Sequence, residues 1–95
     1  MNVYFVVHIK INDETIYQKY IDDCDEIFER YRGKYLAVDD EYEIIEGKST
    51  YSRIVLIHFE SDEDFQKWYY SNDYQRIVKY RLVGAECDSV LVHGK

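Results

Sequence analysis

The chain has 95 residues, of which 46% are hydrophobic and 33% charged, with no proline and only four glycines. This composition is typical of a single globular domain (1–95) rather than a disordered chain, and it favours helices and strands over loops. The 12 basic and 19 acidic residues give a net charge of −7, which argues against nucleic acid as a partner because the phosphate backbone would be repelled. No apolar run approaches the ~20 residues that a membrane span needs, so we expect no membrane contact.

Cys24 and Cys87 are the only cysteines, and no C-x-x-C motif occurs. Residues 1–12 lack the basic region and the cleavage site of a signal peptide. We therefore expect a cytoplasmic protein with two reduced thiols. No cysteine–histidine cluster and no glycine-rich phosphate loop is present, so the sequence predicts neither a metal site nor a cofactor.

The first third of the chain predicts a strand followed by a helix. Residues 3–11, VYFVVHIKI, are rich in β-branched and aromatic side chains, which favours a strand. Residues 12–33 repeat apolar side chains every three or four positions, which is typical of an amphipathic helix. Asn12 or Asp13 can cap its start, and Gly33 is expected to end it in the left-handed conformation. The apolar stripe consists of Ile16, Tyr17, Tyr20, Ile21, Cys24, Ile27, Phe28 and Tyr31.

Two strands are predicted next, over residues 34–47 and 51–61, with a turn at 47–49. The second of these is apolar on both faces and is expected to be central in a sheet. An acidic run, 39–46, lies on the first of them. We interpret it as a solvated edge that discourages pairing with other sheets.

The last third predicts two helical pieces and a closing strand. Ser61 can cap a helix over 61–73, and residues 71–73 resemble a break followed by a second cap. A further short helix then runs to Gly84, and residues 86–94 form the last strand.

The predicted order is β-α-β-β-α-β, which is an α+β ferredoxin-like arrangement with an antiparallel four-stranded sheet. Its helices cover one face of the sheet, and no predicted element remains to cover the other face. An apolar face of this size is seldom exposed on a monomer, so we expect a homodimer in which a second subunit covers it. The uncovered side chains are Tyr4, Val6, His8, Ile54, Leu56 and His58.

Several motifs resemble one family, in order and with matching spacing over nearly the whole chain. They are Tyr17-x-x-Tyr20, RGKYLA (32–37), EIIEG (43–47), and Trp68-Tyr69-x-Ser71-x-x-Tyr74-Gln75 followed by Arg81. The family is domain-of-unknown-function family 1330. One departure is Asn72, where the family often has proline. The resemblance implies a dimeric α+β barrel, in which two ferredoxin-like sheets face each other. That superfamily includes cofactor-independent oxygenases, small isomerases, haem-handling enzymes and proteins without a known reaction, and this family belongs to the last group.

The stretch WYYSNDY (68–74) has four aromatic rings in seven residues, and the chain has eleven tyrosines against four phenylalanines. An aromatic residue at helical spacing is usually core, which is the plain interpretation of Trp68. The second interpretation is a ligand cavity, since buried tyrosine hydroxyls need polar partners. Arg81 could form a salt bridge to Glu46 or Glu86, or could bind the carboxylate of a small organic ligand. The candidate ligand-binding residues are Tyr17, Tyr20, Trp68, Tyr69, Tyr74 and Arg81.

Two functions remain open at this point. One is a small-molecule-binding protein without chemistry. The other is a cofactor-independent oxygenase or isomerase acting on a small aromatic or acidic metabolite. In the second case the catalytic candidates are His8 or His58 as the base and Tyr20 as a hydroxyl donor, together with Tyr74. The two histidines share a sheet face, but they lie toward opposite ends of antiparallel strands, more than ~10 Å apart.

Overall fold

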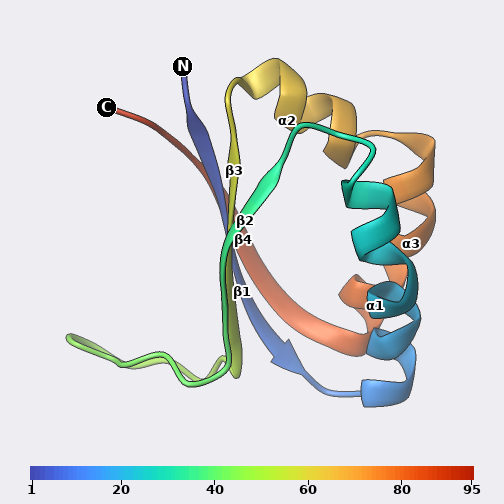
Figure 1. Cartoon of the computed structure of the whole chain (residues 1–95). Coiled ribbons are helices and arrows are strands. Elements are labelled where there is room, and N and C mark those ends of the chain that lie inside the picture. The colour runs from blue at the N-terminus through green and yellow to red at the C-terminus, as the bar shows by residue number, and fades with distance from the viewer.

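A computed structural model describes all residues from 1 to 95. Four antiparallel strands form one sheet in the order β2-β3-β1-β4, and three helices lie on one side of it (Figure 1). This confirms the predicted α+β ferredoxin-like order, in which the second helical segment is divided in two. The elements are β1 (Val3–Ile11), α1 (Glu14–Phe28), β2 (Lys34–Asp39), β3 (Arg53–Phe59), α2 (Asp62–Tyr69), α3 (Asn72–Gly84) and β4 (Ala85–His93).

The hydrophobic core lies between the helices and one face of the sheet. Alternate residues of β1 and β3 point into it because successive side chains of a strand face opposite sides. Aromatic rings fill its centre: Trp68 packs edge-on against Phe5 and Phe28 and, more nearly parallel, against Phe59, with ring centroids 5.5–6.0 Å apart. The core interpretation of Trp68 is therefore confirmed. The buried residues of β1 and β3 are Val3, Phe5, Val7, Ile9, Val55, Ile57 and Phe59.

Each helix begins at a capping side chain. The Asp13 carboxylate accepts a hydrogen bond from the backbone N–H of Ile16 at 3.0 Å. Ser61 caps α2, and the Ser71 hydroxyl caps α3 by accepting from the N–H of Tyr74 at 3.1 Å. These caps satisfy backbone donors that have no partner inside the helix. The predicted caps at both helical segments, and the break between α2 and α3, are confirmed.

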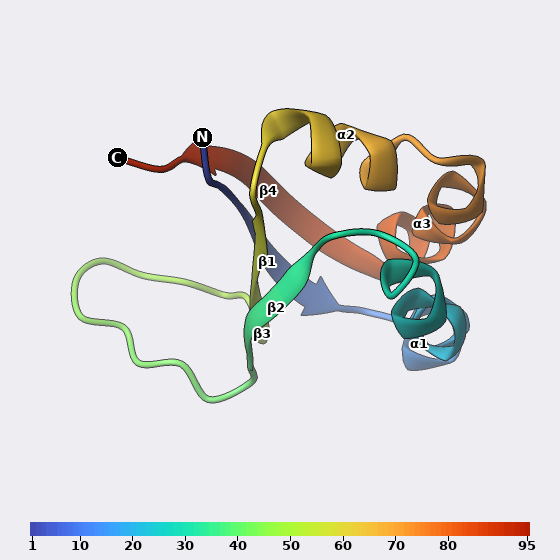
Figure 2. The ribbon, with the colours of Figure 1, turned by 45° about the horizontal axis from the view of Figure 1, so that its top comes forward.

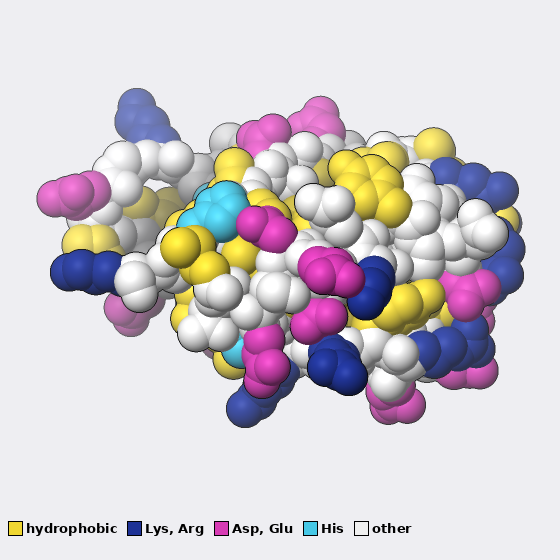
Figure 3. All heavy atoms as spheres, turned by 90° about the horizontal axis from the view of Figure 1, so that it is seen from above, with side chains coloured by type: hydrophobic (Ala, Val, Ile, Leu, Met, Phe, Trp, Pro, Cys, Tyr) yellow, Lys and Arg dark blue, Asp and Glu magenta, His cyan; other side chains and the backbone are white.

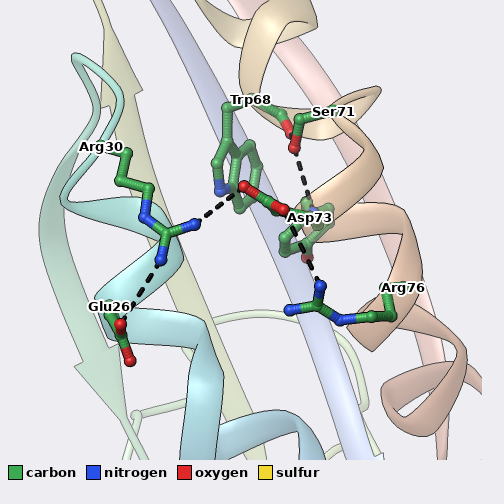
Figure 4. A network of polar contacts seen from close by, with 7 residues as sticks. Glu26, Arg30, Trp68, Ser71, Asp73 and Arg76 are labelled. Carbon is green, nitrogen blue, oxygen red and sulfur yellow. Dashed lines mark hydrogen bonds and ion pairs between the residues drawn. The ribbon is translucent and has the colours of Figure 1, made fainter.

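A chain of charged side chains ties α1 to α3 (Figure 4). Arg30, just after α1, lies 3.4 Å from Glu26 and 2.8 Å from Asp73 of α3, and Asp73 is also 3.8 Å from Arg76. Exposed ion pairs of this kind contribute about 0–1 kcal/mol each. Their contribution to the packing of the two helices is therefore small.

The prediction that α1 continues to Gly33 is wrong. The helix ends at Phe28, and Gly33 does not have the positive φ of a left-handed cap. Glycine is required there for space instead. A Cβ atom at this position would lie 2.4 Å from the ring of Phe28 and 2.6 Å from that of Phe59. The chain thus passes directly over the aromatic core on its way into β2.

The predicted strand over 34–47 is also too long, because β2 ends at Asp39. The Asp39 carboxylate accepts from the backbone N–H of Glu41 at 2.8 Å, which turns the chain away from the sheet. The facing strand β3 starts only at Arg53, so residues 40–52 have no strand to pair with. They form a long loop that projects from the sheet, and the acidic run lies mainly on this loop.

The sheet surface turned away from the helices is called the open face here. It combines half-buried and exposed apolar side chains in its centre, and no element of the chain covers it (Figure 1). No helix is long and apolar enough to cross a bilayer. Seen from the end where both termini lie, acidic and basic side chains are interspersed over the visible surface (Figure 3). The open face includes Tyr4, Val6, His8, Lys10, Lys34, Ile54, Leu56, His58, Glu86, Asp88, Val90 and Val92.

Candidate functional site

A cavity of about 300 Å³ lies between α1, α3 and the sheet. This volume is at the lower end of the range for small-molecule sites. Val38 and Asp25, both exposed, line part of it, so the cavity reaches the surface beside α1 and β2. Its lining is mostly apolar. The residues are Phe5, Val7, Ile9, Tyr17, Tyr20, Ile21, Cys24, Asp25, Tyr35, Val38, Arg53, Val55, Ile57, Trp68, Tyr74 and Arg81.

Arg81 is the one charged side chain of the buried core, with only 2% of its surface exposed. It forms no ion pair in the chain, so neither proposed salt bridge, to Glu46 or to Glu86, is present. Its guanidinium carbon lies 5.7 Å from the centre of the Tyr20 ring, a cation–π contact. Its Nε and Nη1 atoms are buried without a hydrogen-bond partner. Two donors of a buried cation are thus unsatisfied beside a cavity.

Arg81 keeps its positive charge despite this burial. Burial acts to lower the pKa of Arg81, the neighbouring Tyr74 and Tyr20 act to raise it, and the net shift is upward. A guanidinium does not lose its proton in proteins in any case. The cavity wall therefore carries a permanent positive charge with no negative partner.

Tyr20 and Tyr74 place their hydroxyl groups in the same region. The two oxygens are 2.8 Å apart and buried, so one hydroxyl donates to the other. Burial raises the pKa of both groups above the ordinary value, for Tyr20 by a large margin. Both hydroxyls therefore stay protonated at neutral pH. They can donate or accept a hydrogen bond, but neither is a ready proton acceptor in the sense of a catalytic base.

Five of the six predicted ligand-binding residues line this cavity, and Tyr69 does not. Tyr69 instead stacks on Phe65, with ring centroids 5.5 Å apart at 20°. Trp68 is both core and cavity wall, since it is buried and also lines the cavity. Its Nε1 donor is buried without a hydrogen-bond partner.

Arg53 is a cavity residue that the sequence reasoning missed. It donates two hydrogen bonds to Asp40, from Nε at 2.6 Å and from Nη2 at 3.0 Å, and its guanidinium lies 5.8 Å from the centre of the Tyr17 ring. The hydrogen bonds from the Arg53 guanidinium hold the pKa of the Asp40 carboxyl below its usual value. The sequence does contain a pattern that could have identified Arg53 as a candidate. Arg53 lies on the same strand face as Val55 and Ile57, and a charged residue on an apolar face is unusual.

Cys24 and Tyr35 also line the cavity and were not predicted as site residues. Burial raises the pKa of the Cys24 thiol to about 11, so at neutral pH it is a neutral thiol rather than a nucleophilic thiolate. Nothing in the lining resembles an activated nucleophile.

The two histidines lie elsewhere. His8 and His58 are on the open face, and the cavity is on the helix side of the sheet. His8 pairs across the strands with Ile54, four residues from His58, which corresponds to a separation of about 13 Å along the strand. The Nε2 atom of His58 contacts the Asn2 side-chain oxygen at 3.0 Å. Within one chain the histidines thus share neither a metal ion nor the cavity.

Comparison with solved structures identifies the class of fold. A protein of unknown function from Rhodopseudomonas palustris, RPA0582, superposes with a TM-score of 0.81 at 15% identity, over 99% of this chain and 82% of that one. A dimeric ferredoxin-like protein of unknown function from Jannaschia sp. CCS1 gives 0.72 at 10% identity, over 99% and 100%. SnoaB, a cofactor-independent oxygenase from Streptomyces nogalater, gives 0.69 at 10% identity, over 99% and 93%. The protein is therefore a ferredoxin-like α+β protein.

The family is shown by sequence. The model of the family described as "Domain of unknown function (DUF1330)" matches residues 2–95, and the chain belongs to this family. No functionally curated protein matches the sequence.

The unpartnered charge leads to a prediction about stability. Replacing Arg81 by Met removes a buried cation whose donors are unsatisfied, which costs the folded state about 1–3 kcal/mol, and loses a cation–π contact worth about 0.5–2 kcal/mol. We expect Arg81→Met to raise the free energy of unfolding by about 1 kcal/mol, measured by urea denaturation of the ligand-free protein.

Arg76→Met is the matched control, because Arg76 is on the same helix but exposed, with a 3.8 Å contact to Asp73. It is expected to change the free energy of unfolding by less than about 0.5 kcal/mol. A loss of 2 kcal/mol or more in Arg81→Met would show instead that Arg81 is a structural residue whose interactions stabilise the fold.

Proposed function

We propose that the protein is a homodimeric binding protein whose cavity takes a small organic acid. The observation that carries the proposal is Arg81, a permanent cation that is 2% exposed, has no acidic partner and has two unsatisfied donors. A carboxylate is the complementary ligand, since a guanidinium can offer it two parallel charge-assisted hydrogen bonds.

The remainder of the lining supports a ligand with an apolar, preferably aromatic, body. Aromatic rings and aliphatic side chains make up most of the wall. The hydroxyl pair of Tyr20 and Tyr74 and the Nε1 of Trp68 add polar groups beside it. A volume of about 300 Å³ suits a molecule with one or two rings rather than a nucleotide. The ligand-binding residues that we propose are Tyr17, Tyr20, Trp68, Tyr74 and Arg81. Tyr69 packs against the rings of Trp68 and Tyr74, with centroids 6.0 and 5.4 Å apart, and supports their positions.

Binding without chemistry is favoured over catalysis by the positions of the candidate bases. The histidines are on the opposite side of the sheet, and the tyrosine hydroxyls and the Cys24 thiol have raised pKa values. The likeness to an oxygenase rests on the fold, which hosts many functions. We place the protein in the cytoplasm, in line with its two free cysteines.

The ligand class can be tested with benzoate and its neutral isostere benzamide. Trp68 is the only tryptophan and lines the cavity, so its fluorescence reports occupancy. We expect benzoate to bind, benzamide to bind at least tenfold more weakly, and Arg81→Met to lose benzoate binding by about tenfold or more, as charge-assisted hydrogen bonds are removed.

Arg76→Met again serves as the control and is expected to bind benzoate as the wild type does. Equal binding of benzoate and benzamide, or undiminished binding by Arg81→Met, would contradict the proposed role of the guanidinium. So would failure of a panel of benzoate, phenylacetate and hexanoate to change the fluorescence at all.

The homodimer is supported by the apolar open face, which nothing in the chain covers. Solved ferredoxin-like relatives of unknown function are described as dimeric. Two such faces packed together would remove the exposed apolar patch from water on both copies.

A substitution in the open face tests this assembly. Val90 is 58% exposed and lies on the edge strand β4, opposite Val6 of the central strand β1. We expect the wild type to sediment as a dimer and Val90→Lys as a folded monomer, because the lysine would lose its hydration where the second copy covers this face. Val83→Lys, at a 71% exposed position on α3, is expected to remain a dimer. A wild-type monomer would contradict the assembly.

A further inference from the structure

The loop between β2 and β3 projects from the same side of the sheet as the open face (Figures 1 and 2). In both views the helices lie on one side of the sheet, and this green segment extends away on the other. We call residues 40–52 the arm. It is long for a connection between two antiparallel neighbours, which usually takes two to five residues.

The arm is held in position by its own contacts. The hydroxyl of Tyr42 contacts the Ser49 hydroxyl at 2.7 Å and donates to the carbonyl of Tyr51, which joins its two halves. At its end, the backbone N–H of Ser52 donates to the carbonyl of Ile9 at 2.8 Å. Its first residue is fixed as well, through the paired hydrogen bonds of Asp40 with Arg53. These contacts hold the two ends of the arm together and join them to the sheet.

The base of the arm lies on the open face itself. The Tyr51 ring packs edge-on against His8 with centroids 5.4 Å apart, and its hydroxyl donates to the Asp88 carboxylate. His8 and Asp88 are cross-strand partners on that face. The arm and the open face therefore form one continuous surface.

The tip of the arm exposes apolar side chains. Ile45 is 84% exposed and Ile44 is 50% exposed. Two adjacent exposed isoleucines, on a loop whose ends are held together, are expected to contact something, because exposed apolar groups of this kind mark interaction sites.

We propose that the arm clasps a second copy of the chain, with Ile44 and Ile45 packed against the partner subunit. This rests on the homodimer proposed above. The position of the arm favours a second copy as the partner, because a molecule bound to the open face would lie directly beside the arm. A second copy is also favoured by charge. Besides Asp40, which is paired with Arg53, the arm carries Glu41, Glu43 and Glu46, none of which forms an ion pair within the chain. Lys10 and Lys34, on the open side toward opposite ends of the sheet, have no ion pair within the chain either.

Sedimentation of an arm variant tests the clasp. Ile45→Glu changes an 84% exposed side chain and is expected to leave the thermal unfolding of the monomer unit unchanged. We expect it to weaken dimerisation at least tenfold, measured as the dissociation constant by analytical ultracentrifugation. Val83→Glu, 71% exposed on α3, is the matched control and is expected to stay within twofold of the wild type.

The outcomes separate this inference from the dimer on which it rests. A wild-type dimer whose dissociation constant is unchanged in Ile45→Glu would overturn the clasp and leave the dimer intact. A monomeric wild type would overturn both. Equal weakening by Ile45→Glu and Val83→Glu would show a general effect of added charge and would also overturn the clasp.

Discussion

The burial of one charged side chain in an aromatic core is the constraint around which this structure is arranged. Arg81 projects from α3 against the ring of Tyr20, and no carboxylate of the chain forms an ion pair with it. A buried donor without a partner lowers stability, and a protein retains such a group where it serves function. The tyrosine hydroxyl pair and the apolar lining then follow as the remaining walls of one small site. Fold and site share the same residues, since Trp68 and Tyr74 are core and cavity wall at once.

Asp40 links this site to the proposed dimer. It is the first residue of the arm, and it holds Arg53, which lines the cavity and lies over the ring of Tyr17. A partner that fixes the arm would therefore also fix one part of the cavity wall. Any such coupling would act through a single guanidinium and not through a movement of the core. The sheet meanwhile separates the two proposed functions, because the cavity lies on its helix face and the proposed dimer contact on its open face.

The sequence was sufficient for most of the fold. The period-two pattern of side chains, rich in β-branched and aromatic residues, predicted β1 and β3. Capping residues predicted where all three helices start. Two boundaries failed for reasons that are not local. A side chain at position 33 would collide with the rings of Phe28 and Phe59, which belong to α1 and β3. The strand β2 ends at Asp39 because its pairing partner β3 starts at Arg53 and offers no residue beyond that point. For the candidate site, helical spacing predicted that Tyr17, Tyr20, Trp68, Tyr74 and Arg81 face the same cavity, and all five line it. The spacing could not reveal that Arg81 has no acidic partner, because that depends on where every carboxylate of the folded chain lies.

The most direct test of the central claim is a crystal structure of the protein grown with benzoate. Our interpretation predicts a benzoate carboxylate at about 2.7–2.9 Å from the guanidinium nitrogens of Arg81, with its ring against the aromatic wall. The contrary result is an Arg81 whose guanidinium is paired with a carboxylate of the protein itself. Such a pairing would mean that the charge is structural and that the cavity is not reserved for an acid.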